Sequence, residues 1–336
     1  MIRTWKRIET VLPALLFAPA VFGQASVPQG PTLGVAFDSA SGELRRIVGL
    51  PGAAHFSAPL LTGGRFSSLV LSPQQDFGLG IRARDSQLYV VHLIGSTAPV
   101  PVSGMTWNPS RMVLSPSGQA AVLFGPSNSI RWLTGLPDSP TLSDEVDLSA
   151  MGEALQASAI SDDGLVVAAF GSTGTPSQLY AIRAGSGPQL IGTAHRTTAI
   201  GFLPGSTAVL VADAAARQIL IFRLSDSGAS RNVVATEADG IIDPVALGAS
   251  GSGRWAIAAN ASDQKVIRID LTGAAPASSF VCPCQPSEIT RLAGDAVFQL
   301  GGLSDQPLWI FDGDDANPRI VFVPAPVERR VPRGSR

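Results

Sequence analysis

Residues 250–270, SGSGRWAIAANASDQKVIRID, decide the fold of this chain. They begin with a small polar turn, Ser250–Gly253, and continue into an apolar run from Trp255 to Ala259. After a polar break, a second run from Val266 to Asp270 alternates between apolar and polar side chains. A continuous apolar run is typical of a strand with both faces covered, and alternation is typical of a half-buried strand. The stretch therefore predicts a turn followed by two β-strands, of which the first lies nearer the core.

The same order of features recurs along the chain. Comparable turns lie 42 to 47 residues apart at Ser72–Gln75, Ser115–Gly118, Ser161–Gly164, Leu203–Ser206, Ser250–Gly253 and Leu292–Asp295. An alternating strand begins at a similar offset after each turn, at Leu88, Ile130, Leu179, Ile219, Val266 and Leu308. Further apolar runs lie between turn and alternating strand, at Ala120–Phe124, Leu165–Phe170 and Ala208–Val211. A period of about 44 residues indicates an array of similar supersecondary units.

Each unit is predicted to contain four short strands. An inner strand ends at the turn, the apolar strand and the alternating strand follow, and a weaker outer strand such as Glu145–Leu148 or Ile320–Val323 completes the unit. This arrangement is typical of a β-propeller blade, whereas solenoid repeats, the main alternative, are usually shorter or helical. The sequence therefore predicts an all-β fold, with a β-propeller domain over residues 31–324.

The number of blades depends on the N-terminal part of the propeller. Six complete units run from Arg65 to Val323, and a further hairpin, Leu33–Asp38 with Leu44–Val48, precedes them. Counting back by the repeat offset assigns these two strands as the third and fourth strands of a unit that lacks its first two. We expect seven blade positions with one thin N-terminal blade, and six blades are the alternative. Closure of the ring matters because an open blade edge exposes unpaired backbone groups.

The first residues have the pattern of a secretory signal peptide. Basic residues precede an apolar run, Val11–Phe22, and small residues follow as far as Ala25. We expect cleavage after Ala25, which removes residues 1–25, and a periplasmic or secreted mature protein. The run is shorter than a typical membrane span, so no transmembrane span is expected after cleavage; an uncleaved N-terminal anchor is the alternative. Residues 325–336 are predicted to form a flexible C-terminal tail.

The composition excludes some classes of protein. Charged residues make up 15% of the chain and hydrophobic residues 45%, which opposes disorder. The formal net charge is −2, so the chain has no basic excess to neutralise phosphates. Nucleic acid is therefore not an expected partner.

The repeated units carry a resemblance to known repeats. Ser115–Gly118 and Ser161–Gly164 are similar to the Ser-Pro-Asp-Gly turn of WD40-like repeats, and residues 256–260 followed by 266–270 are similar to a YVTN repeat. The chain thus resembles secreted bacterial β-propellers of these kinds over Phe66–Val323. The resemblance implies a propeller architecture. It does not select an activity, because such propellers include interaction scaffolds, lactonases and cofactor-dependent dehydrogenases.

The only cysteines, Cys282 and Cys284, are one residue apart. An exported chain meets an oxidising compartment, where paired thiols tend to oxidise. We expect a structurally minor disulfide clasp in the connection between the fifth and sixth complete units. A reactive redox pair, a soft-metal chelate and free buried thiols are the alternatives.

Candidate binding residues come from the strand register, because no complete catalytic motif is present. The connections into the inner strands and the connections between the apolar and alternating strands are expected on one face of the ring. The candidates on this face are Trp107, His195, Asp213, Asp243, Asn260, Asp263 and Glu288. We expect this face to bind an envelope or extracellular protein, peptide or glycan at the channel mouth, without catalysis and without a cofactor.

The alternative function is a metal-dependent hydrolase or lactonase with its site in the channel. In that hypothesis, carboxylate and amide oxygens together with one imidazole hold calcium or another divalent ion that activates water. The residues that would supply these ligands are His195, Asp213, Asp243, Asn260 and Glu288.

Overall fold

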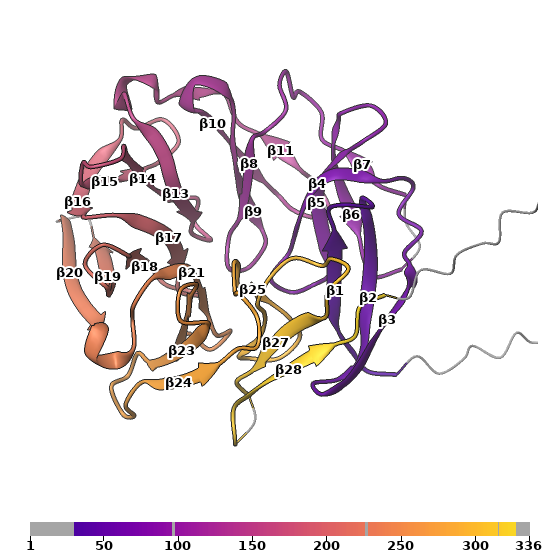
Figure 1. Cartoon of the computed structure of the whole chain (residues 1–336). Helices are drawn as coiled ribbons and strands as arrows, with labels where there is room; N and C mark the ends of the chain where they lie inside the picture. Colours follow the sequence, from indigo (N-terminus) through magenta and orange to yellow (C-terminus); the bar gives the residue numbers. More distant parts are fainter. Residues whose placement is uncertain (1–29, 96–97, 226–227, 315, 327–336) are drawn as a thin grey trace, which may run out of the picture.

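The computed structural model describes residues 30–95, 98–225, 228–314 and 316–326. The predicted signal peptide, residues 1–25, lies outside this part, as do residues 327–336 of the predicted tail. Within the described residues, the strands form seven sheets arranged in a ring, and consecutive sheets follow one another around it (Figure 1). The fold is an all-β seven-bladed β-propeller, so the predicted fold class is confirmed and the six-bladed alternative is wrong.

Blades are numbered here in chain order. Blade 1 consists of β1 (Thr32–Asp38), β2 (Glu43–Leu50) and β3 (Ala53–Pro59). Blade 2 consists of β4 (Phe66–Leu71), β5 (Phe77–Arg82), β6 (Leu88–His92) and β7 (Val100–Pro101). Blade 3 consists of β8 (Arg111–Leu114), β9 (Ala120–Phe124), β10 (Ser129–Thr134), β11 (Thr141–Leu142) and β12 (Val146–Asp147). Blade 4 consists of β13 (Ala154–Ile160), β14 (Val166–Gly171), β15 (Ser177–Ile182) and β16 (Gln189–Ala194).

The second half of the ring is regular. Blade 5 consists of β17 (Thr197–Phe202), β18 (Ala208–Asp213), β19 (Gln218–Ser225) and β20 (Gly228–Ala235). Blade 6 consists of β21 (Pro244–Ala249), β22 (Trp255–Asn260), β23 (Lys265–Asp270) and β24 (Ser278–Val281). Blade 7 consists of β25 (Thr290–Arg291), β26 (Val297–Gln299), β27 (Leu308–Asp312) and β28 (Arg319–Val323). Single 3₁₀ turns lie at η1 (Pro126–Asn128), η2 (Ser149–Met151) and η3 (Glu237–Asp239), and no helix of the described part has the length and apolarity to cross a membrane.

The recurring turns join the first and second strands of the blades. In the four turns that begin with serine, that serine is buried, and its hydroxyl oxygen accepts a backbone N–H at or just before the start of the second strand. These pairs are Ser72 with Phe77 at 3.3 Å, Ser115 with Ala120 at 3.3 Å, Ser161 with Leu165 at 2.9 Å and Ser250 with Trp255 at 3.0 Å. Serine recurs here because its short side chain bonds to nearby backbone groups in tight turns.

The core is divided among the junctions between blades. Each described hydrophobic cluster joins two consecutive blades, and the second strands, such as β9 and β14, are buried along their whole length. A blade is a twisted sheet with an apolar neighbour on each face, so its second strand has no polar side. This explains why those strands read as continuous apolar runs in the sequence.

The predicted strand positions in blade 1 are wrong. β1 is the innermost described strand of that blade, but it runs in the direction of the second strands of the other blades. Near its start, Val35 N–H donates to Gln75 and the Leu33 carbonyl accepts from Ala293, both in turns between first and second strands, whereas Asp38 at its end bridges Leu303 in the β26–β27 connection. The hairpin therefore takes the second and third places and β3 the fourth, and the described part of blade 1 has no strand in the first place. Ala53–Pro59 escaped prediction because its alternation is weak and it contains alanine, serine and proline, which favour strands poorly. The outer strand of blade 3 also differs from the prediction, since β11 and β12 both pair with β10.

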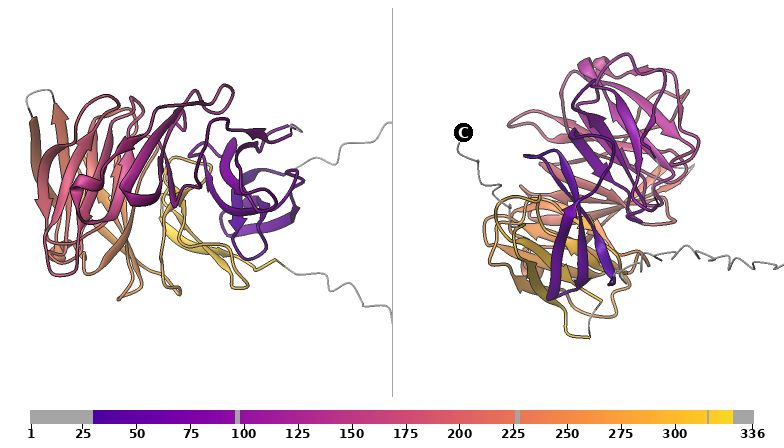
Figure 2. Two further views of the ribbon diagram at one scale, coloured as in Figure 1. Left: turned by 90° about the horizontal axis from the view of Figure 1, so that it is seen from above. Right: turned by 90° about the vertical axis from the view of Figure 1, so that its right-hand side faces the viewer.

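Blade 1 closes the ring between blade 7 and blade 2, and Figure 2 shows its strands beside the last blade. Leu33, Ala36 and Ile47 pack against blade 7, while Val35 and Leu44 pack against blade 2. The buried Gln75 side chain accepts from Val35 N at 2.8 Å and donates to the Arg291 carbonyl at 2.9 Å. Side-chain packing and hydrogen bonds thus join the two ends of the described chain.

Candidate functional site

The antiparallel order of strands gives the ring two different faces. The turns between first and second strands lie on one face, which we call the turn face. The connections between second and third strands, and the connections from one blade to the next, lie on the opposite face, which we call the loop face. The candidate residues Trp107, His195, Asp213, Asp243, Asn260, Asp263 and Glu288 all belong to loop-face connections or to strand ends beside them.

Asp213, at the end of β18, holds the connection between blades 4 and 5. Its carboxylate is fully buried and accepts the backbone N–H groups of His195 at 2.8 Å, Arg196 at 3.0 Å and Ala216 at 3.2 Å. Burial by itself would raise the pKa of Asp213, but these backbone hydrogen bonds outweigh it and lower the pKa. Asp213 is therefore a buried anion that fixes the loop above it.

The imidazole of His195 contacts that carboxylate and is exposed to solvent. Its Nδ1 is 3.1 Å from Asp213 Oδ2, while its side chain is 69% exposed. Because an ionised carboxylate only accepts, Nδ1 carries the proton in this contact and Nε2 is left as the outward group. The arrangement presents an imidazole nitrogen on the loop face in a fixed orientation.

Arg196 extends this cluster toward blade 6. Its guanidinium donates to Asp243 at 3.2 Å, in the connection before β21, and remains 57% exposed. The structure therefore brings together His195, Asp213 and Asp243 through a residue that the sequence analysis did not single out. A signal was present, because Arg196 directly follows His195 in the same connection.

Asn260 has the position in blade 6 that Asp213 has in blade 5. It is fully buried, accepts from Ile242 N at 3.4 Å and donates from Nδ2 to the Gly240 carbonyl at 2.7 Å. In blade 7 the equivalent residue, Gln299, donates to Glu288 at 3.4 Å and to the Gly301 carbonyl at 2.5 Å. A polar residue at the end of the second strand thus fastens the incoming connection in three consecutive blades.

Among the described residues, no hydrogen bond or ion pair joins Glu288 or Asp263 to the His195 cluster. Burial raises the pKa of the Glu288 carboxyl, and the hydrogen bond from Gln299 lowers it by less. Asp263 pairs with Lys265 at 3.2 Å in the loop between β22 and β23. Within the described ranges, no three His, Cys, Asp or Glu side chains form a group that could hold a metal ion.

Trp107 lies in the connection from blade 2 to blade 3. Its Nε1 donates to Glu145 at 2.8 Å, which together with a contact from Ser129 lowers the pKa of that carboxyl. The indole also lies against Gly125, where an added Cβ would come within 2.9 Å of the ring. Trp107 is one of the residues that line a cleft of about 630 Å³ on the loop face.

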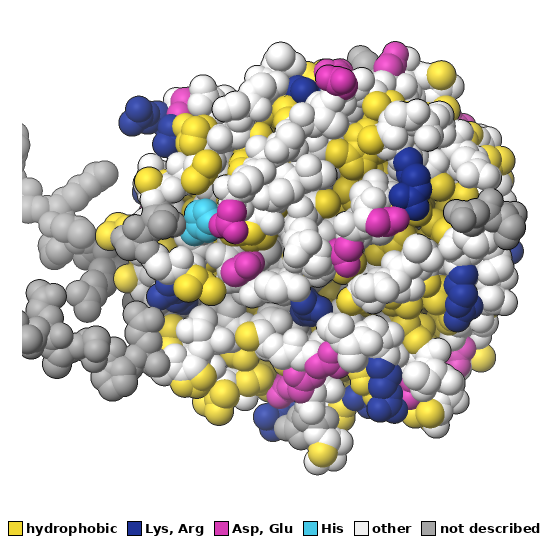
Figure 3. Space-filling view, turned by 180° about the vertical axis from the view of Figure 1, so that it is seen from behind, with side chains coloured by type: hydrophobic (Ala, Val, Ile, Leu, Met, Phe, Trp, Pro, Cys, Tyr) yellow, Lys and Arg dark blue, Asp and Glu magenta, His cyan; other side chains and the backbone are white. Residues whose placement is uncertain are grey.

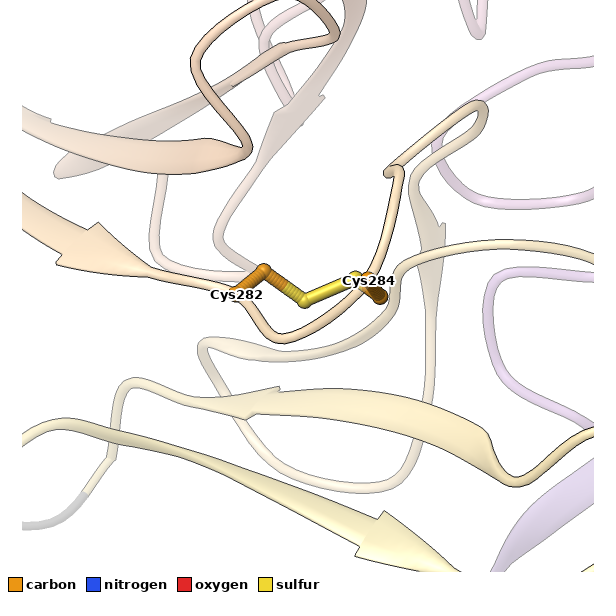
Figure 4. The surroundings of a disulfide bond; sticks show 2 residues. All are labelled: Cys282 and Cys284. Carbon is orange, nitrogen blue, oxygen red and sulfur yellow. A yellow bond between two sulfur atoms is a disulfide. The ribbon is translucent and has the colours of Figure 1, made fainter.

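Cys282 and Cys284 form a disulfide with their Cα atoms 5.0 Å apart (Figure 4). Cys282 is buried in the cluster between blades 6 and 7, and its backbone N–H donates to the Gln264 carbonyl at 2.7 Å. Cys284 is half-buried and lines a second loop-face cleft, of about 530 Å³, together with Trp309. The clasp shapes the wall of that cleft.

Charged side chains are dispersed over the face of the molecule drawn in Figure 3. On the face drawn in Figure 3, acidic and basic side chains alternate with hydrophobic ones and do not gather into a patch of one sign. Such a surface provides no extended field for steering a polyanion or a polycation.

Comparison with known proteins gives the fold. No protein-family model matches the chain, and no curated protein matches it in sequence. A functionally unknown protein from Desulfotomaculum acetoxidans is similar in structure, with a TM-score of 0.59 and 15% identity over 88% of this chain and 100% of that chain. A selenomethionine-substituted virginiamycin B lyase from Staphylococcus aureus has a TM-score of 0.53 and 14% identity over 77% of this chain and 84% of that one.

At these identities the likeness shows the fold alone. The chain is structurally similar to bacterial β-propellers, and no repeat family is identified, so the likeness to WD40-like and YVTN repeats stays a prediction.

Proposed function

We propose that this protein is an exported, noncatalytic β-propeller whose loop face binds an envelope or extracellular protein, peptide or glycan. The observation that carries the proposal is that partners within the fold hold three side chains on this face, of which two are exposed and Trp107 is half-buried. Asp213 orients His195, Asp243 orients Arg196 and Glu145 orients Trp107. Side chains fixed before binding lose less conformational entropy when a partner arrives, which favours recognition.

The periplasmic or secreted location rests on the pattern of residues 1–25, and the disulfide supports it. Disulfides form and persist in oxidising compartments and are rare in the cytosol. A rigid ring that presents several loops on one face suits the capture of a partner in that setting.

The test is capture of envelope material by the purified protein. Replacing Trp107 and His195 by Ala should lower the amount of a saturably captured partner at least ~10-fold, because a few well-anchored aromatic and polar residues carry most of the binding energy in interfaces. Thermal unfolding should show that the double variant remains folded, since His195 is exposed and Trp107, which is half-buried against the cluster between blades 2 and 3, lies in a connection outside the strands.

The matched control is Ser117→Ala, in a turn on the opposite face. It should leave capture unchanged. Equal losses from both faces, or turnover of a substrate that a chelator abolishes, would contradict the proposal.

A further inference from the structure

Two clefts on the loop face share an unusual lining. The first, between blades 2 and 3, is lined by Gln87, Ser103, Thr106, Trp107 and Asn108 among others. The second, between blades 6 and 7, is lined by Gln285, Ser287, Gln306 and Trp309 together with the Gly301–Gly302 backbone and the disulfide. Each cleft combines one tryptophan with amides, hydroxyls and exposed backbone, although the two share no sequence.

Neither cleft has an Asp, Glu, Lys, Arg or His among the described residues that line it. This neutrality is local, because the same face carries the Arg196–Asp243 and Lys265–Asp263 pairs elsewhere. Recognition of phosphate, sulfate or carboxylate relies on Arg, Lys or arrays of N–H groups, and recognition of amines relies on acids. The clefts therefore suit a ligand that makes many hydrogen bonds and has no charge.

The tryptophans supply the apolar part of each site. Trp309 packs against Phe322 with the rings tilted by 52° and their centroids 5.5 Å apart, and Phe322 itself is 49% exposed. Trp107 is fixed by its bond to Glu145. A fixed aromatic face surrounded by amides and hydroxyls complements a ring that is apolar on its faces and hydroxylated at its rim. A sugar ring has that construction.

We propose that these two clefts bind neutral carbohydrate, with the sugar rings against Trp107 and Trp309. The proposal rests on the proposed function and names the partner class for the same face. Volumes of about 530 and 630 Å³ lie in the range of small-ligand sites and accommodate a short oligosaccharide. The clefts lie at separate junctions of the ring, so a polysaccharide that reaches both is held more tightly than an oligosaccharide that fills one.

The experiment is calorimetric titration of the full-length mature protein with neutral oligosaccharides and polysaccharides, namely the gluco-, xylo- and N-acetylglucosamine series. Polygalacturonate and dextran sulfate serve as charged comparisons. We expect binding of a neutral series with two sites per chain, and no binding of the charged polymers. Trp309→Ala and Trp107→Ala should each remove one site, and the double variant should lose affinity at least ~10-fold.

Trp255 is the matched control, because it is half-buried at the turn-face end of β22, where Arg254 and Arg268 lie over its ring. Trp255→Ala should leave the titration unchanged. Gln306→Ala provides a second variant, since its side chain is exposed in a loop; it should weaken the blade 6–7 site several-fold while leaving the melting temperature unchanged.

The outcomes separate the two proposals. Envelope capture that depends on Trp107 and His195, without binding of any neutral saccharide, would overturn the carbohydrate assignment and leave the proposed function intact. Saccharide binding that survives the double tryptophan variant would also overturn the assignment. If the wild-type protein neither captures envelope material nor binds a saccharide, both proposals are wrong.

Discussion

Blades 1 and 5 each fill the space between two neighbouring blades, but they have different numbers of strands. Blade 5 has four strands, and its third and fourth, β19 and β20, are eight residues each. Within the described residues blade 1 has three, and its last strand, β3, is an edge that ends at Pro59 beside an irregularity in its pairing with β2. Proline and bulges of this kind protect exposed edges from pairing with other chains.

The comparison shows that ring closure depends on the second and third strands of a blade, and that a blade can close the ring without a first strand. Blade 5 packs against its neighbours through Val209, Leu220 and Ile221, all on its second and third strands. Blade 1 packs through Leu33, Leu44 and Ile47 on β1 and β2, which take the same second and third places. The counterpart of β20 in blade 1 is β3, and the strand that the described part of blade 1 lacks is the counterpart of β17; both junctions of blade 1 are nevertheless filled by apolar side chains.

Deleting residues 33–48 should cause the largest loss of stability. The deletion removes most of β1 and β2, together with the share of blade 1 in the cores that join it to blades 7 and 2. We expect loss of the cooperative unfolding transition seen by circular dichroism, because domains are stable by only ~5–15 kcal/mol. An unchanged transition would show that blade 1 is peripheral and that the ring closes without it.

Gln75→Asn tests how much one side chain contributes to ring closure at blade 1. Asparagine tolerates the left-handed backbone of residue 75, where φ is 60°, but its shorter amide cannot bridge Val35 N and the Arg291 carbonyl. A buried group left unpaired costs ~1–3 kcal/mol, which urea unfolding should show as a lower midpoint with an unchanged slope.

Gln119→Asn, in the corresponding turn of blade 3, is the control for this variant. Its side chain is exposed, so little change is expected. Equal effects of the two substitutions would mean that the contacts of Gln75 do not contribute to closure.

Asp213→Asn tests the blade 5 side and should have the smallest effect, about 1–2 kcal/mol at neutral pH, because backbone N–H groups lose a charged acceptor. The folded pKa of Asp213 is lowered, so its stabilisation is present above the unfolded pKa of about 3.9 and is lost as the pH falls through the folded value. Urea unfolding of wild type and variant at several pH values should therefore show the two stabilities converging as the pH falls below about 4.

The reciprocal exchange, Asn260→Asp, is the matched control. Asn260 donates to the Gly240 carbonyl, which a carboxylate cannot do, so this variant should lose stability as the pH rises. If Asp213→Asn differs from wild type equally at pH 3 and pH 7, the charge on Asp213 is not what holds the connection above β18.

The candidate site was only partly predictable. The strand register predicted that Asp213 and Asn260 lie beside the loop face. It did not predict that both are buried and turned toward the backbone of the incoming connection. That orientation depends on the path of a loop from the preceding blade, which a local pattern does not encode. The sequence showed Trp309 as the aromatic residue of an alternating strand. The cleft beside it is formed with the disulfide loop that connects blade 6 to blade 7, which the strand pattern does not reveal.

The four-stranded repeating unit and its recurrence along the chain could be predicted from the sequence alone. Buried second strands, alternating third strands and serine-led turns are local patterns, because burial on one face or two imposes a period that any short segment displays. The place of the N-terminal hairpin was decided only in the tertiary structure. The strands Leu33–Asp38 and Leu44–Val48 read alike in several places of a blade, and the contacts of Val35 with Gln75, of Leu33 with Ala293 and of Asp38 with Leu303 assign them to the second and third places. Those contacts join residues far apart in the chain, so no local pattern records them.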